Sequence, residues 1–308
     1  MTPAARLLVC LPLVAATTAA AAAQQRVERG WPLSGDHVRL WVPAARGTIT
    51  IAGWDRDSVA VSGTVTGAGP LDGAGNGQVV KLGLQAPAGA PAGSVELQVR
   101  VPHRARVSVV GAGATIAVSG IDGWLDLEAT TGDIRIDGSP EDVRAETLGG
   151  AIEILGGTAR TRVKTVSGPI TLRGAGVDVA ATTLSGPIVV RAAGYQRGAA
   201  GIARGRFESV SGDIRFEGAL GRGAVIELET QSGRIDARLP ADVSADVNAV
   251  SIAGTIENRL TKAAPTRRPD GKGYALRFTA GTGDAAVTIR SFKGAVLLAS
   301  RGTAVSTP

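Results

Sequence analysis

Apolar and polar residues alternate on both sides of a recurring glycine turn, most often Ser-Gly or Thr-Gly. After Gly168, for example, Ile170 and Leu172 are apolar and Thr171 between them is polar. The segment before the same turn alternates as well, with Val163 apolar and Lys164 charged. A period of two residues predicts a β-strand with one buried face, so each unit is a strand, a tight turn and a second strand.

The turn recurs along most of the chain. Successive turn glycines are first 18 residues apart and later 26 or 21 residues apart. A glycine suits a sharp corner because it can adopt a positive φ. Internal repeats of this length are typical of stacked supersecondary units. The turn glycines are Gly132, Gly150, Gly168, Gly186, Gly212, Gly233 and Gly254, with a weaker earlier copy at Gly113 and a later one at Gly283.

We therefore predict an all-β chain that forms a β-solenoid of the parallel β-helix type, with repeats of about 18–21 residues. Stacking coils about 4.8 Å apart would align like residues in buried files and pair the backbone amides. Arg135 would then lie above Glu153, so that outward columns mix charges of both signs. An antiparallel sandwich also contains regular short strands, but it does not require the same columns to recur. The pattern leaves the handedness open.

Residues 1–23 are predicted to be a cleaved secretory signal. Arg6 precedes a short apolar segment, and the small residues before Gln24 offer a cleavage site. Cys10, the one cysteine of the chain, lies within this segment, so the mature chain from Gln24 would contain no disulfide. No later stretch is long and apolar enough to span a membrane. We expect export to the periplasm or to the cell surface.

Residues 24–110 are expected to form an irregular β part that opens the solenoid and caps its core, with a loop rich in Gly, Ala and Pro. The repeats occupy residues 111–300, and residues 301–308 form a tail. The large residues that a cap would use are Trp31, Trp41 and Trp54.

Two longer intervals between turns predict basic loops on the outside of the solenoid. Insertions in solenoids lie on the surface, often at a binding face. Such loops could bind an anionic polymer or a lipid headgroup, or could be solvated surface. The residues selected as candidate partner contacts are Arg197, Arg204, Arg206, Arg267 and Arg268.

The segment LQVRVPHRARVSVVGAGATIAVSGIDGWLDLEATTGDIRIDG combines a strand, a Val-Pro pair and stacked Gly turns, and GTITIAGWDRDSVAV near the front has a similar form. This resembles the bacterial "putative adhesin" family of β-strand repeats, whose function is uncharacterised. The resemblance covers roughly residues 35–300. It implies an exported, β-helical, non-enzymatic protein at or near the cell envelope, with no catalytic residues to carry over.

Composition and charge exclude several classes of function. Aromatic residues make up only 3% of the chain and hydrophobic residues 44%, so the core must be aliphatic. A net charge of +6 with interspersed acids indicates solubility rather than nucleic-acid binding. His37 and His103 lie in different segments, which speaks against a zinc site or a serine triad.

We therefore expect an exported, non-catalytic scaffold or adhesin-like interaction module without cofactor or metal. Its partner would be an unidentified envelope polymer or protein, and self-association through the terminal coils stays open. The alternative is a secreted polysaccharide-active β-helix enzyme, a lyase or hydrolase, because such enzymes can use paired carboxylates. The acidic residues in one outward column are Glu128, Glu146, Glu208 and Glu229.

Overall fold

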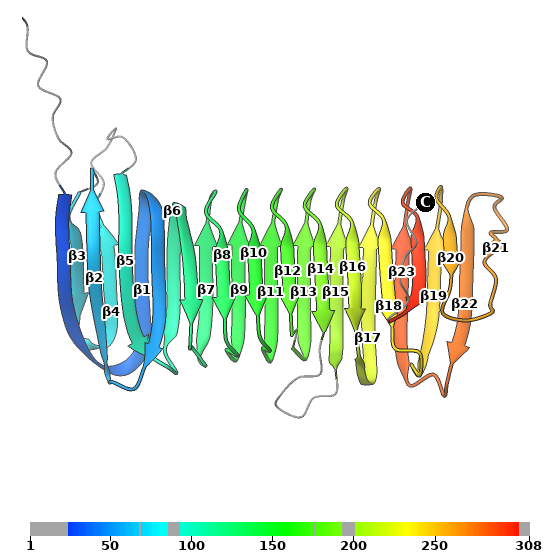
Figure 1. The fold of residues 1–308 in the computed structure, drawn as a ribbon, viewed down its shortest axis with the longest axis horizontal. Helices are drawn as coiled ribbons and strands as arrows, with labels where there is room; N and C mark the ends of the chain where they lie inside the picture. Colours follow the sequence, from blue (N-terminus) through cyan, green and yellow to red (C-terminus); the bar gives the residue numbers. More distant parts are fainter. Residues whose placement is uncertain (1–23, 68, 86–92, 175, 193–200, 302–308) are drawn as a thin grey trace, which may run out of the picture.

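The computed structural model describes residues 24–301, except residues 68, 86–92, 175 and 193–200. The described residues form β-strands and turns and contain no helix. The strands lie across the axis of a long rod, with the described N-terminal residues at one end (Figure 1). This is the all-β solenoid that the repeats predict.

Each coil of the middle region contributes one strand to each of two parallel sheets. The first sheet contains the strands that precede the glycine turns, and the second contains those that follow them. In the first sheet these are β7 (Trp124–Ala129), β9 (Asp142–Thr147), β11 (Arg160–Thr165), β13 (Asp178–Thr183), β15 (Ile202–Ser209) and β17 (Leu220–Thr230). In the second they are β8 (Ile134–Asp137), β10 (Ile152–Leu155), β12 (Ile170–Arg173), β14 (Ile188–Ala192), β16 (Ile214–Gly218) and β18 (Ile235–Leu239).

The core between the sheets consists of aligned aliphatic files. Ile152, Ile170 and Ile188 are paired in register on successive strands, and each is at most 1% exposed. Fully burying such a side chain contributes roughly 1.5–3 kcal/mol. The parallel register confirms the solenoid and excludes an antiparallel sandwich for the repeats. The mixed columns are confirmed as well, because Arg135 Nη1 lies 3.4 Å from Glu153 Oε2.

The turn glycines are needed for close approach rather than for a positive φ. Gly168 does not have a positive φ, contrary to our expectation. A Cβ built on Gly168 would lie 1.8 Å from the carbonyl oxygen of Gly150 in the preceding coil. The same contact recurs at Gly150, Gly186 and Gly212, at 1.9–2.0 Å. Stacked coils therefore exclude any side chain at this corner.

At the N-terminal end the coils do not stack in sequence order. β1 (Gln24–Trp54) pairs in parallel with β6 (Arg106–Ser119) on one side and with β4 (Gly77–Leu84) and β5 (Gly93–Pro102) on the other. The coil built from β4 and β5 thus lies outside β1, although it follows β1 in the chain. The antiparallel strands β2 (Ser58–Thr66) and β3 (Leu71–Gly75) complete this end. β6 runs without a break across residue 110, where we expected the repeats to begin.

The three tryptophans of this end have different environments. Trp31 packs against the core and covers β3, where a Cβ on Gly73 would lie 2.3 Å from its ring. Trp54 is half-buried, with the guanidinium carbon of Arg56 5.2 Å from its ring centroid. Trp41 is 54% exposed, so its assignment to the core or cap was wrong. Its position has outward parity on β1, between the buried residues Leu40 and Val42.

The C-terminal end shows the same departure from sequence order. β23 (Ala285–Ser291) pairs with both β17 and β19 (Ala245–Ser251), and β24 (Val296–Ser300) pairs with both β18 and β20 (Ile256–Asn258). The last coil is therefore inserted between two earlier ones, as the position of β23 between β18 and β19 illustrates (Figure 1). β22 (Tyr274–Ala280) pairs antiparallel with β19 and with the short β21 (Thr266–Arg267).

This insertion corrects the position of the last turn. Gly283, which we expected to be the final copy, lies in the turn that joins β22 to β23 and has a positive φ of 76°. The structural equivalent is Gly294, whose Cβ would lie 1.7 Å from the carbonyl oxygen of Gly233. The antiparallel strand β22 accounts for the difference, because it returns the chain before the final coil begins.

Candidate binding groove along the first sheet

A row of apolar side chains projects from the glycine-turn edge of the first sheet. These residues, called the apolar ridge below, are exposed although they are large and aliphatic or aromatic. They occupy the position two residues before the turn glycine. The ridge consists of Leu148 (57% exposed), Val166 (41%), Leu184 (51%) and Val210 (40%), and of Phe292 (44%) beyond the polar Gln231 that follows β17.

The turn itself fixes the direction of the ridge. The residue before each ridge residue is a buried Thr or Ser, as at Thr165, and its hydroxyl binds the backbone. Thr165 Oγ1 accepts a 3.0 Å hydrogen bond from Gly168 N–H and donates to the carbonyl of Gly150 at 3.4 Å. Because alternation continues into the turn, the next residue, Val166, must point outward. At this corner the polar residue Thr165 is therefore buried and the apolar residue Val166 is exposed, the opposite of the usual arrangement in a strand.

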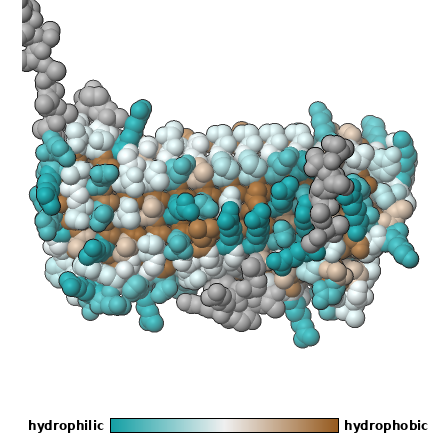
Figure 2. Space-filling view, in the orientation of Figure 1, coloured by the Kyte–Doolittle hydropathy of each residue, from teal (hydrophilic) through white to brown (hydrophobic). Residues whose placement is uncertain are grey.

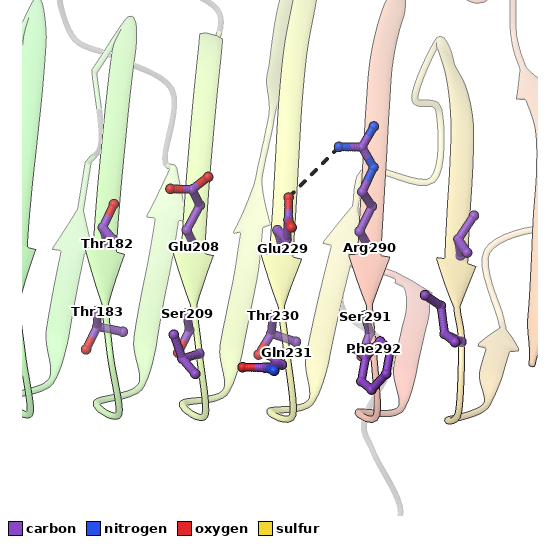
Figure 3. A pocket seen from close by; sticks show the side chains of 13 residues that line it. Thr182, Thr183, Glu208, Ser209, Glu229, Thr230, Gln231, Arg290, Ser291 and Phe292 are labelled. Atoms are coloured by element: carbon purple, nitrogen blue, oxygen red, sulfur yellow. Dashed lines mark ion pairs between the residues drawn. The ribbon is translucent and has the colours of Figure 1, made fainter.

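Two hollows lie beside the ridge and share Thr182 and Thr183 on β13 and Val210 just after β15. One has a volume of about 530 Å³ and is lined by Leu148, Val166 and Leu184. The other, about 620 Å³, is lined by Val210 and Phe292. Together they form one lengthwise groove over the first sheet. Figure 2 shows the face of the rod opposite to that in Figure 3, and a hydrophobic band with hydrophilic side chains on either side is visible on that face as well.

The far side of the groove is a row of mainly charged side chains. Figure 3 shows Thr182, Glu208, Glu229 and Arg290 side by side on successive strands, above the Thr and Ser row. Glu229 Oε2 lies 3.9 Å from Arg290 Nη1, and Glu208 Oε1 lies 2.6 Å from Arg206 Nη2. The hydrogen bond from Arg206 to Glu208 raises the pKa of Arg206 above its ordinary value. Toward the other end the row continues through Lys164, Glu146 and Glu128.

The hydroxyl groups on the floor of the groove are already engaged. Ser209 Oγ accepts a 2.8 Å hydrogen bond from Gly212 N–H, and Thr230 Oγ1 accepts one of 3.0 Å from Gly233 N–H. The serines of the turns donate to carbonyls of the neighbouring coil, as Ser185 Oγ does to Val166 at 3.3 Å. These side chains hold the corners together, which is the role that the turn sequence predicts.

The predicted partner-contact residues do not form one surface. Arg197 lies outside the described residues. Arg204 and Arg206 belong to β15 rather than to a loop, and Arg204 Nη2 lies 3.5 Å from Asp178 Oδ2. The strand resumes at Ile202, so the inserted segment is shorter than the spacing of the glycines suggests.

The second basic group lies at the C-terminal end of the rod. Arg267 is on β21, and its guanidinium carbon lies 5.8 Å from the ring centroid of Tyr274. Arg268 follows it and pairs with Asp270 at 2.9 Å. β21 lies at the end of the rod and β15 nearer its middle, so these two arginines are remote from Arg206 (Figure 1). Their role in binding a partner stays a prediction.

The apolar ridge was missed in the sequence. The signal was the column two residues before each turn glycine, where Leu148, Val166, Leu184 and Val210 recur at positions of outward parity. The residue before it is Thr147 in the first of these repeats and a Thr or Ser in each later one. An apolar residue that repeats on the outward side of a strand is unusual and marks a surface that is not simply solvated.

No protein-family model matches the chain, and no curated protein matches it. Solved structures of low identity do align with it. A "putative cell adhesion protein" from Clostridium sporogenes ATCC 15579 is 8% identical, with 90% of this chain and 100% of that chain covered and a TM-score of 0.21. A "putative lipid binding protein" from Parabacteroides distasonis ATCC 8503 is 13% identical, with 89% and 96% covered and a TM-score of 0.43. At these scores neither carries an argument about function, and the resemblance to the adhesin family stays a prediction.

Within the described part of the chain, no helix is long and apolar enough to cross a membrane.

Proposed function

We propose that the protein is an exported, non-catalytic β-solenoid that serves as a scaffold or adhesin-like interaction module of the cell envelope. The apolar ridge and the adjoining groove are its contact surface. The observation that carries this proposal is the exposure of Leu148, Val166 and Leu184 on consecutive coils. Single exposed apolar residues are ordinary, but a continuous row marks an interaction site.

The shape of the groove favours an extended partner that lies along the rod. Each coil offers a similar contact, about 4.8 Å from the next. Many weak contacts of this kind add up to strong binding when one chain engages several coils at once. The charged row beside the ridge contains both signs, as at Glu146 and Lys164, so that polar groups of the partner have complements on either side.

The surroundings of the acidic residues support binding rather than chemistry. Glu208 and Glu229, two of the acidic residues that the enzymatic alternative would use, are each paired with an arginine. The floor hydroxyls beside them are engaged in the turns.

Co-sedimentation of the mature chain, residues 24–308, with isolated bacterial envelope fractions tests the proposal. In the ridge variant Leu148→Ser, Val166→Ser, Leu184→Ser and Val210→Ser are combined. The control combines Leu155→Ser and Val189→Ser, which remove outward apolar residues from the second sheet. We expect the ridge variant to lose binding and the control to keep it.

Equal binding of both variants would refute the assignment of the ridge as the contact surface. The proposal that the protein is not an enzyme is tested by incubating it with anionic polysaccharides. Turnover that disappears in Glu208→Gln or Glu229→Gln would establish the enzymatic alternative instead. Export is tested by N-terminal sequencing of the protein from intact cells, where we expect the chain to begin at Gln24.

A further inference from the structure

A separate hollow of about 450 Å³ lies on the first sheet near its N-terminal end. Its lining includes Arg39, Ser108 and Asp126, which are paired in one file across β1, β6 and β7. The short side chain of Ser108 stands between two long ones, and this leaves space above the sheet. The volume is in the range of pockets that bind small ligands.

Trp124 forms one wall of this hollow and is fixed in place. Its side chain is 40% exposed, although tryptophan is usually well buried. The guanidinium carbon of Arg106 lies 4.3 Å from the ring centroid, and the indole N–H donates a 3.3 Å hydrogen bond to Glu141. Arg106 is in turn held by Asp36, whose Oδ2 lies 3.0 Å from Arg106 Nε. Arg106 thus covers one face of the indole, and the rest of the ring borders the hollow in one orientation.

The charges around the hollow are paired, with one exception that matters for a ligand. Asp142 Oδ2 lies 2.8 Å from Arg160 Nη1, and Asp126 Oδ1 lies 3.9 Å from Arg144 Nε. Arg39 is exposed and has no ion pair or hydrogen bond to any residue that the structure describes. Its guanidinium can therefore form the bidentate pair with a carboxylate that suits its geometry.

We propose that this hollow binds a sugar residue that carries a carboxylate. The apolar C–H face of the sugar packs on the part of the Trp124 ring that Arg106 leaves uncovered, and Arg39 binds the carboxylate. Ser108 lies on the strand between them and Asp126 on the strand of Trp124, and both can hydrogen-bond the sugar hydroxyls. This site is distinct from the groove, and it gives the protein a specificity for acidic glycans that the groove alone does not define.

The test is isothermal titration calorimetry of the mature chain with oligogalacturonate. The comparison ligands are the same oligosaccharide after reduction of its carboxyl groups and sodium acetate. We expect Trp124→Ala to weaken binding of the acidic oligosaccharide about tenfold or more through loss of the aromatic contact. We expect Arg39→Gln to weaken it about tenfold but to leave the neutral oligosaccharide unaffected.

The control variant is Trp41→Ala, which removes an exposed tryptophan of the same sheet that does not line the hollow. It should bind as the unaltered protein does. The proposal is overturned if neither oligosaccharide binds, if Trp41→Ala weakens binding as much as Trp124→Ala, or if acetate binds as well as the sugar. Arg39 lies at the surface, so the Arg39→Gln comparison stays informative even if Trp124→Ala is destabilised.

Discussion

Thr183 Oγ1 accepts a 3.0 Å hydrogen bond from the backbone N–H of Gly186, and this contact closes the turn between the two sheets. The threonine side chain is 2% exposed, so water cannot replace it. Thr183→Val keeps the shape of the side chain but leaves the Gly186 N–H without its partner. We expect the free energy of unfolding to fall by about 1–3 kcal/mol. Chemical denaturation of the mature chain measures this change.

The control for this prediction is the neighbouring residue on the outward side. Thr182→Val alters a side chain that is only half-buried and lines the groove. Its effect on stability should be within about 0.5 kcal/mol. If both variants were equally stable, the hydroxyl of Thr183 would have no part in closing the turn.

The close stacking of the turn glycines makes a second prediction. Gly168→Ala would place its Cβ 1.8 Å from a backbone carbonyl oxygen, so the coils must separate locally. We expect a loss of about 1–3 kcal/mol or more, since overpacking against backbone cannot be relieved by a rotamer change. Gly149→Ala is the matched control, because the nearest atom to its Cβ is 3.9 Å away. A thermal melt in which the two variants have the same midpoint would contradict the stacking.

The N-terminal cap makes a third prediction. Trp31 packs across the end of the core, whereas Trp41 is largely exposed. Trp31→Ala should lower the free energy of unfolding by about 1–3 kcal/mol, less than the loss for a fully buried tryptophan. Trp41→Ala should change it by no more than about 0.5 kcal/mol. Equal losses for the two variants would mean that Trp31 does not cap the core.

The middle of the rod could be predicted from the sequence because its columns repeat. Ile152, Ile170 and Ile188 recur with the same neighbours, and only stacking in register buries all three. The reason for the glycines could not be deduced in the same way. The constraint on Gly168 comes from a carbonyl of the preceding coil, which no local pattern reveals.

The ends could not be predicted, because periodicity identifies strands but not their order in the stack. The apolar and polar residues of β23 alternate in the same way wherever the strand is inserted. Its pairing with both β17 and β19 depends on long-range contacts. Of the two candidate sites, likewise, one could be predicted from the sequence and the other could not. The apolar ridge is present as a column in the sequence, whereas the hollow at Trp124 requires Arg39 to lie beside Ser108 on a distant strand.

The insertion of β23 also determines the groove. Glu229 and Arg290 are neighbours only because β23 lies next to β17, and the second hollow extends across both strands. If β19 were next to β17 instead, Val250 would take the place of Arg290 beside Glu229, and the ion pair would not form.

Disulfide cross-linking tests this arrangement most directly, because the chain after residue 23 contains no cysteine. Glu227 and Thr288 are register partners on β17 and β23, and Thr288 and Asn248 are partners on β23 and β19. Strands that pair lie about 4.8 Å apart, within the range that a disulfide can bridge, whereas strands two positions apart are too distant. We predict that the double variant with Glu227→Cys and Thr288→Cys forms a disulfide on mild oxidation and that the variant with Glu227→Cys and Asn248→Cys does not. The reverse result would contradict the inserted coil and, with it, the groove built across it.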